Sequence, residues 1–452
     1  MRGTEGRSHS LRNSSIIDTA INSIDGGFFL SKIKYLKEGI KITSKIINDI
    51  MFLYDVRTKD TYFTRKGTCK MGFRNMILFM INFVKKSLQI ELDNFAKITP
   101  ENNKITKQAF SQARHKISPK AFIYLLNEIN KWFYKDTPFI TYRDYRLLAI
   151  DGTVLEIYNS PELRDTFGYI ENQNSKVAHA RASALYDIEN DMIIASKLVH
   201  YRESERETAR KLIDDLCLLG KRNDLIIFDR GYPSHDFISF IESKDIKYLM
   251  RVSSKFFKVV VNAPKADQII EVTSKGKTIS MRVLKFKLKS GIIETLITNI
   301  FNEDFSVADF EELYFKRWGI EVKYNEIKNK LQIENFTGKT SISIEQDFYA
   351  TMYLTNMVAL AKKDANQEIE KSNEDKNLKY EYKVNTNVLV GKLKDNLIEM
   401  LGAKPWKRSK ILKEIQDEIV KNVIPIRVDR NFNRKNHKST QMQNRMNKKR
   451  AL

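Results

Sequence analysis

Two stretches of this sequence repeat one pattern, an unbroken apolar run that ends in an aspartate with a glycine close behind. The first is Leu147-Leu-Ala-Ile-Asp151-Gly, and the second is Leu225-Ile-Ile-Phe-Asp229-Arg-Gly. Short unbroken apolar runs are typical of strands that are buried on both faces of an α/β sheet. Functional groups of such sheets gather at the carboxyl ends of the strands. The pattern therefore predicts an α/β fold in which Asp151, followed by a turn, and Asp229 end two neighbouring parallel strands.

A third acidic residue comes from a predicted helix at 310–331, where good helix formers dominate. At roughly 100° per residue, a polar stripe runs along the middle of the apolar face of this helix. The stripe consists of Tyr314, Arg317, Glu321 and Lys328. Buried charged groups are costly unless they face each other, a metal ion or a charged ligand. We therefore interpret the stripe as a site.

The alternative for a charge-rich helix is a solvated face with opposite charges one turn apart. This helix has a separate set of charges that suits water: Glu312, Lys316, Lys323, Glu326 and Lys330. Apolar residues are predicted to flank the stripe: Leu313, Ile320, Ile327 and Leu331 on one side, and Phe315, Trp318 and Val322 on the other. Because a solvated set already exists, the charges on the inner face need their own explanation.

The remaining patterns predict an alternating order of elements. Strands are expected at 178–185, 192–198 and 247–252, and helices at 204–219 and 234–243. Alternation at 258–262 and 281–290 predicts a small antiparallel sheet within 253–300. An apolar helix at 348–360, a charged link at 362–379 and helices within 385–423 follow. The order is thus three strands, helix, strand, helix, strand, insertion and helix.

The two strand-end aspartates and the helix glutamate suit a metal site. Asp151, Asp229 and Glu321 together could hold two divalent ions. Two metals about 4 Å apart stabilise the attacking and leaving oxygens of an in-line phosphoryl transfer. Oxygen-only ligands favour Mg²⁺ or Mn²⁺ over Zn²⁺. We therefore predict a magnesium-dependent phosphoryl-transfer site.

These motifs resemble the DDE transposases of bacterial insertion sequences. The spacing Tyr314-x2-Arg317-x3-Glu321-x6-Lys328 is similar to the group with the Tyr-Arg-Glu-Lys signature, insertion-sequence family four. The resemblance runs from about residue 65 to 340. It implies that the three acids are catalytic metal ligands and that Tyr314, Arg317 and Lys328 contact transposon-end DNA near the scissile phosphate. Arg230 is expected as a further phosphate contact.

The resemblance also implies the architecture, a ribonuclease-H-like catalytic core that is interrupted by a β-rich insertion. The expected boundaries are an N-terminal helical segment at 1–60 with its first 15 residues disordered, a helical DNA-end-binding domain at 61–140, the core at 141–252 and 301–365, the insertion at 253–300, a helical C-terminal dimerisation region at 366–426 and a basic tail at 427–452. One departure concerns a tryptophan that relatives place in the insertion to hold a flipped base. Here the tryptophans are Trp132, Trp318 and Trp406, and the insertion carries Phe256 and Phe257, for which core packing is the preferred interpretation.

A short predicted helix, capped by Thr106 and reaching Ile117, is a candidate reader of DNA sequence. Amide and basic side chains pair with base edges in the major groove. We therefore expect Lys107, Gln108 and Gln112 to contact the transposon end, and Arg114, on another face, to hold a phosphate. An ordinary surface helix is an equal alternative.

The composition favours a polyanionic partner. Lys and Arg number 78 against 56 Asp and Glu, a net charge of +22. Cys69 and Cys217 cannot form a disulfide framework or a four-thiolate zinc site. The apolar run at 76–84 is too short to cross a bilayer, and the polar start lacks a signal core. We expect a cytoplasmic, nucleoid-associated protein without membrane contact.

Together these features predict a cut-and-paste DNA transposase. Its partners would be double-stranded DNA, both transposon ends and target, and a second copy of the chain in a synaptic homodimer. One alternative is a site- or structure-specific endonuclease on the same fold that lacks strand transfer. Another is a domesticated DNA-binding protein without catalysis, which the presence of all three acids argues against.

Overall fold

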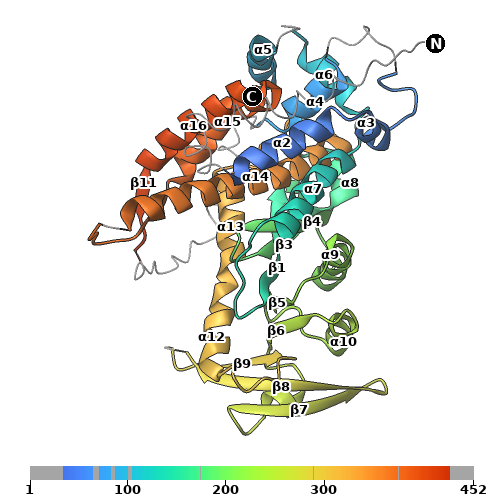
Figure 1. The fold of residues 1–452 in the computed structure, drawn as a ribbon. Coiled ribbons are helices and arrows are strands. Elements are labelled where there is room, and N and C mark those ends of the chain that lie inside the picture. The colour runs from blue at the N-terminus through green and yellow to red at the C-terminus, as the bar shows by residue number, and fades with distance from the viewer. Residues whose placement is uncertain are drawn as a thin grey trace, which may run out of the picture.

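The computed structural model describes residues 34–64, 71–82, 87–99, 104–173, 175–288, 290–374 and 376–427. A nine-stranded sheet forms the centre, with helices beside it and a helical part at one end (Figure 1). This is the mixed α/β fold that the sequence predicts. The first 15 residues, Cys69 and nearly all of the basic tail lie outside the described residues.

The central strand of the sheet is β1 (Arg146–Glu156). It pairs antiparallel with β3 (Ser175–Asp187) on one side and parallel with β5 (Asp224–Phe228) on the other. Beyond these, β4 (Met192–His200) pairs antiparallel with β3, and β6 (Lys247–Arg251) pairs parallel with β5. The five strands therefore stand in the order β4-β3-β1-β5-β6.

Helices connect these strands as the sequence predicts. After β4 comes α9 (Glu205–Leu219), and after β5 comes α10 (His235–Ser243). Both lie on one side of the sheet, opposite α12 (Val307–Lys316) and α13 (Trp318–Asn329) (Figure 1). The connection from β1 to β3 holds α8 (Pro161–Phe167) and the short β2 (Tyr169–Asn172).

The first aspartate does not end its strand, contrary to the expectation of a turn after Asp151. β1 continues to Glu156 because β3 is long enough to stay paired with it throughout. On its other edge, β1 pairs with β5 only as far as Ala149, opposite Ile227. Asp151 lies two residues beyond that pair on β1, and Asp229 lies two residues beyond it, directly after the end of β5. The register thus places both aspartates at the same level of the sheet.

The insertion does not form a separate small sheet. Its strands β7 (Asp267–Ser274), β8 (Lys277–Lys287) and β9 (Ile293–Thr298) form an antiparallel meander whose last strand pairs with β6. They therefore extend the central sheet, and Figure 1 shows them at the end away from the helical part.

The strand predicted at 258–262 is instead a single helical turn, α11 (Lys258–Val261). Val260, within this turn, is fully buried. Lys285 of β8 donates to the carbonyl oxygens of Val261 at 2.8 Å and Ala263 at 2.6 Å. These bonds satisfy carbonyl groups that the short helix leaves without intrahelical partners.

The predicted helix at 310–331 is divided in two at Arg317. α12 (Val307–Lys316) begins with a capping box at Ser306, and α13 (Trp318–Asn329) follows directly. At the junction the Arg317 N–H donates to the carbonyl of Tyr314, and the Ile320 N–H donates to the carbonyl of Arg317. These tight bonds span three residues each, as in a 3₁₀ turn.

The orientation of α13 also differs from the prediction. Phe315, Trp318 and Val322, expected to be inward, are 44%, 42% and 65% exposed, whereas Lys323, expected in water, is 3% exposed. The reason is close packing of α13 against the end of β3. A Cβ on Gly319 would lie 3.3 Å from Ile188, so the absence of a side chain lets the helix approach there.

The charged stretch predicted as a link from residue 362 is largely helical. α14 (Ser341–Asn373) is 33 residues long and runs through the domain boundary expected at 365. Asp364 is buried in it and accepts hydrogen bonds from the backbone N–H groups of Lys34, Tyr35 and Leu36 at 2.8–3.0 Å. It thereby caps α2 (Tyr35–Ile47), whose own N-cap residue makes no side-chain bond.

The other elements surround α14 at the helical end of the molecule (Figure 1). They are α3 (Ile50–Val56), α4 (Phe73–Met80), α5 (Leu88–Ile98), α6 (Lys107–Arg114), α7 (Lys120–Asp136), α15 (Thr386–Gly402), α16 (Pro405–Lys421) and the paired short strands β10 (Tyr382–Val384) and β11 (Val423–Pro425). Within the described ranges, no helix is both long and apolar enough to cross a membrane.

Candidate active site

The three predicted acids approach one another because α13 packs on the carboxyl half of β1. Two side chains of α13 attach it there. The Tyr324 hydroxyl donates to the backbone oxygen of Asp151 at 2.8 Å, and Lys328 Nζ donates to that of Val154 at 2.8 Å. Glu321 lies one turn before Tyr324, so the helix brings its carboxylate toward the level of the two aspartates.

Two residues of the predicted polar stripe join the acids. Arg317 Nη2 donates to Glu321 Oε1 at 3.0 Å, and its Nη1 lies 3.9 Å from Asp151 Oδ2. The Tyr314 hydroxyl donates to Asp229 Oδ1 at 3.2 Å. Tyr314 and Arg317 are 5% and 6% exposed, so the prediction that this part of the stripe faces inward is confirmed.

Burial dominates the electrostatics of the site. It raises the pKa of Asp151 to about 6, although the Gly152 N–H, at 2.8 Å, and the Arg317 guanidinium favour the charged carboxylate. Burial, aided by the negative charge of Asp229, likewise raises the pKa of Tyr314 to about 12. Burial thus disfavours the charged form of Asp151.

The donor set suits a hard divalent cation, because all three candidate ligands are carboxylates. The place between Asp151 and Glu321 already holds a positive charge, the guanidinium of Arg317, whose Nε is buried without a partner. In this arrangement no three acidic, histidine or cysteine side chains among the described residues converge closely enough to hold one ion. The type of ligand therefore fits a divalent metal, whereas in this structure Arg317 occupies the place between Asp151 and Glu321.

Comparison with known sequences gives the family of this site. Residues 142–357 match the family described as Transposase DDE domain, a range that includes β1, β5 and α13 and all three acids. This part of the chain is therefore similar to a transposase DDE domain.

One curated relative is Transposase InsG for insertion sequence element IS4 of Escherichia coli (strain K12). This chain is 22% identical to it over 279 residues, which cover 56% of this chain. The match spans 60% of the relative's own length. It agrees with the sequence resemblance to insertion-sequence family four.

A solved structure, the piggyBac transposase synaptic complex with hairpin DNA, covers 91% of this chain and 88% of its own. The sequence identity is 11% and the TM-score is 0.40.

The other residues that the sequence predicts to contact DNA lie in different places. Arg230 is exposed directly after Asp229. Lys107, Gln108 and Gln112 are exposed on α6, in the helical end of the molecule (Figure 1). Their exposure leaves them free to meet DNA, and their role stays a prediction.

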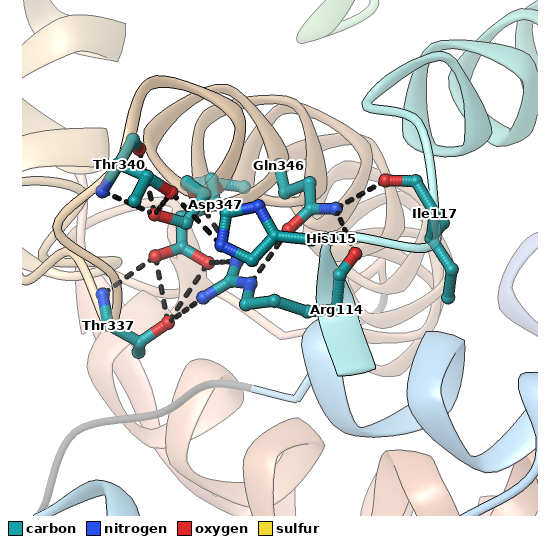
Figure 2. A network of polar contacts seen from close by, with 9 residues as sticks. Arg114, His115, Ile117, Thr337, Thr340, Gln346 and Asp347 are labelled. Carbon is teal, nitrogen blue, oxygen red and sulfur yellow. Dashed lines mark hydrogen bonds and ion pairs between the residues drawn. The ribbon is translucent and has the colours of Figure 1, made fainter. Parts of the chain in front are cut away.

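The expectation that Arg114 holds a DNA phosphate is corrected by the structure. Its side chain is 1% exposed and points into the protein (Figure 2). It donates to Gln346 at 2.7 Å, to Thr337 at 2.8 Å, to Asp347 at 2.6 Å and to the Ser343 carbonyl at 3.2 Å. Arg114 therefore fastens α6 to the start of α14 and to the segment after α13.

Sequence reasoning missed a partly buried ionic cluster behind α13, which we call the ionic quartet: Asp191, Lys323, Glu326 and Lys362. Lys323 lies 2.7 Å from Asp191 and 3.3 Å from Glu326, and Lys362 lies 2.8 Å and 2.9 Å from the same two acids. Burial opposes the charge on Asp191, but the two ammonium groups hold its pKa well below the usual range. The quartet joins α13 to α14 and to the turn between β3 and β4.

Glu205 and Arg251 were also missed at the edge of the site. Glu205, in the first turn of α9, lies beside Gly231, and its charge adds to those that raise the pKa of Asp151. Arg251, at the end of β6, hydrogen-bonds Tyr314 and forms an ion pair with Glu294. Neither stands in a motif, since both depend on strands and helices that only the fold brings together.

Proposed function

We propose that this chain is the transposase of an insertion sequence, which binds the terminal inverted repeats of its element, cleaves the DNA there and joins the ends to target DNA. One observation carries the proposal. Tyr314 and Arg317 contact three carboxylates that come from β1, from the end of β5 and from α13. The same residues form the spaced signature on which the family resemblance rests.

The strand order supports a ribonuclease-H-like catalytic core as the finer description of the fold. In β4-β3-β1-β5-β6, three antiparallel strands adjoin two parallel ones, and helices lie on both sides. The core would comprise 141–252 and 301–365, with 253–300 as an insertion that lengthens the sheet. The remaining proposed units are 1–60, 61–140, 366–426 and 427–452.

Asp151, Asp229 and Glu321 would hold the divalent metal that DDE transposases use, Mg²⁺ with Mn²⁺ as a substitute, in two sites. Bound there, the ions stabilise charge on the attacking and leaving oxygens of a phosphoryl transfer. The protein orients the first ligand in advance, because the Gly152 N–H fixes one oxygen of Asp151.

Arg317 has two roles in this proposal. In the metal-free protein it neutralises Asp151 and Glu321, and on loading it turns to the scissile phosphate, where a guanidinium makes charge-assisted bonds. Tyr314, Lys328 and Arg230 would contact the same DNA strand. A second copy of the chain, associating through 366–426, would bring two ends together on the nucleoid.

The proposal is tested by nicking of DNA from the flanks of the gene, with Mg²⁺ and with EDTA. We expect strand cleavage at the inverted repeat that requires the metal. Because protonation of Asp151 competes with metal binding, the rate should fall about tenfold per pH unit below a midpoint at or under about pH 6. More Mg²⁺ should shift that midpoint to lower pH. Cleavage in EDTA, or a flat profile down to about pH 4.5, would contradict the proposed site.

Recognition of the inverted repeat is proposed to lie on α6. Gln108 and Gln112 are exposed one turn apart, so both could enter one major groove. Gln112→Ala should cost about 1–3 kcal/mol at one or two base positions and leave non-specific affinity nearly unchanged. Affinities for a panel of point-mutated ends measure this. Equal weakening on every end, or none, would show that α6 does not read bases.

A further inference from the structure

One residue near the acids belongs to neither the sequence signature nor the expected metal ligands. Tyr324 lies one turn after Glu321 on α13 and is 8% exposed. Its hydroxyl donates to the backbone oxygen of Asp151 at 2.8 Å. Ala184 of β3 pairs with Asp151 of β1 across the sheet. The hydroxyl is thus held to the backbone of the residue that carries the first acid.

From this position, Tyr324 fixes the distance between α13 and β1. β1 has lost its β5 partner beyond Ala149, so this part of the strand is held by β3 on one edge only. The bonds of Tyr324 and Lys328 attach α13 to it. Of the two, the Tyr324 bond is made to the residue that carries the first carboxylate.

The consequences for the site follow from the covalent geometry. Glu321 and Tyr324 share one helical turn, so fixing the Tyr324 hydroxyl fixes the height and rotation of Glu321. Asp151 is fixed at both ends, its backbone oxygen by Tyr324 and its Oδ1 by the Gly152 N–H. A relaxed bond at Tyr324 would let the two carboxylates move relative to each other.

We propose that Tyr324 is a positioning residue of the acidic site, whose hydroxyl sets the relative placement of Asp151 and Glu321 and with it the affinity of the site for a divalent cation. This inference rests on the proposed function and adds a residue to it. Tyr324 is buried beneath the site, so it acts through the carboxylates and not on DNA.

The test compares two tyrosine-to-phenylalanine variants of the full chain. Tyr324→Phe removes the hydroxyl and keeps the buried ring. Tyr353→Phe is the matched control, because Tyr353 is fully buried on α14 and its hydroxyl bonds Thr43, in the helical part. Mn²⁺ affinity is measured without DNA by electron paramagnetic resonance, with Asp151→Asn defining the signal of the site.

Loss of a group that orients metal ligands typically costs about 10- to 100-fold in metal affinity or activity. We expect Tyr324→Phe to weaken Mn²⁺ binding and slow single-turnover cleavage by roughly that factor, with end affinity unchanged. Tyr353→Phe should leave Mn²⁺ affinity, cleavage rate and end affinity unchanged. It should lower the melting temperature by about as much as Tyr324→Phe does. Equal Mn²⁺ affinities in the two variants would overturn the proposal.

The proposed function and the positioning role of Tyr324 can fail separately. A wild-type chain that binds Mn²⁺ through Asp151 but cuts no DNA would overturn the proposed function. The Mn²⁺ affinities of the two variants would still decide whether Tyr324 positions the carboxylates, because that measurement uses neither DNA nor cleavage.

Discussion

We expect a loss of cleavage at the element's ends of about 10³-fold or more, equivalent to about 4 kcal/mol of barrier, from each of Asp151→Asn, Asp229→Asn and Glu321→Gln. Each substitution removes a carboxylate charge while keeping nearly the same shape. Binding of the ends should be retained, since the contacts proposed for recognition lie on α6. Gel shifts and nicking assays on the same preparations measure both quantities.

Folding of the variants supplies the control for this expectation. Burial raises the pKa of Asp151 to about 6, above the value of about 3.9 for an exposed aspartate. The stability linked to that shift is present below about pH 4 and is lost as the pH rises through about 6. Relative to wild type, metal-free Asp151→Asn should therefore be more stable at pH 8 than at pH 4. Near-normal nicking by any one of the three variants would contradict the assignment of the site.

Asp191→Asn should destabilise the protein by clearly more than the roughly 0–1 kcal/mol of an exposed ion pair, because it leaves buried Lys323 and partly buried Lys362 with one carboxylate instead of two. Lys323 and Lys362 both lie within 2.8 Å of Asp191, and the Lys323 side chain is only 2% exposed. Chemical denaturation at neutral pH measures the change. Since the quartet holds α13, cleavage should fall as well.

The matched control is Asp236→Asn, the same substitution in an exposed ion pair. Lys275 and Asp236 are 2.9 Å apart, with side chains 76% and 60% exposed. Such pairs contribute about 0–1 kcal/mol. If Asp191→Asn proves as mild as Asp236→Asn, the quartet does not hold the helix in place.

The sequence was sufficient for the order of the core and for its acids because those features are local. An apolar run that ends in aspartate is visible within about six residues, and the period of a helix shows which side chains share a stripe. Asp151, Asp229 and Glu321 could therefore be chosen before their contacts were known. Their equal level on the sheet follows from strand register, which no local pattern contains.

The features that were predicted wrongly depend on distant parts of the chain. By residue type, Arg114 is expected at the surface. It is buried because its partners Gln346 and Asp347, which lie 232 and 233 positions further on, pack against it. Likewise, Lys323 counts as solvent-facing by periodicity alone, and the turn at Asp191 and Lys362 of α14 bury it. Hydrophobic patterning treats all charges as exposed, so it cannot identify a buried charge whose partner lies elsewhere in the chain.

Strand joining is the measurement that tests the central claim most directly. A short duplex that ends in the cleaved inverted repeat, with a free 3′-hydroxyl, is incubated with the full chain, Mg²⁺ and a supercoiled target plasmid. A transposase predicts covalent end–plasmid products that disappear with Glu321→Gln. Cleavage of the uncut end without any joined product would contradict transposition and indicate an endonuclease.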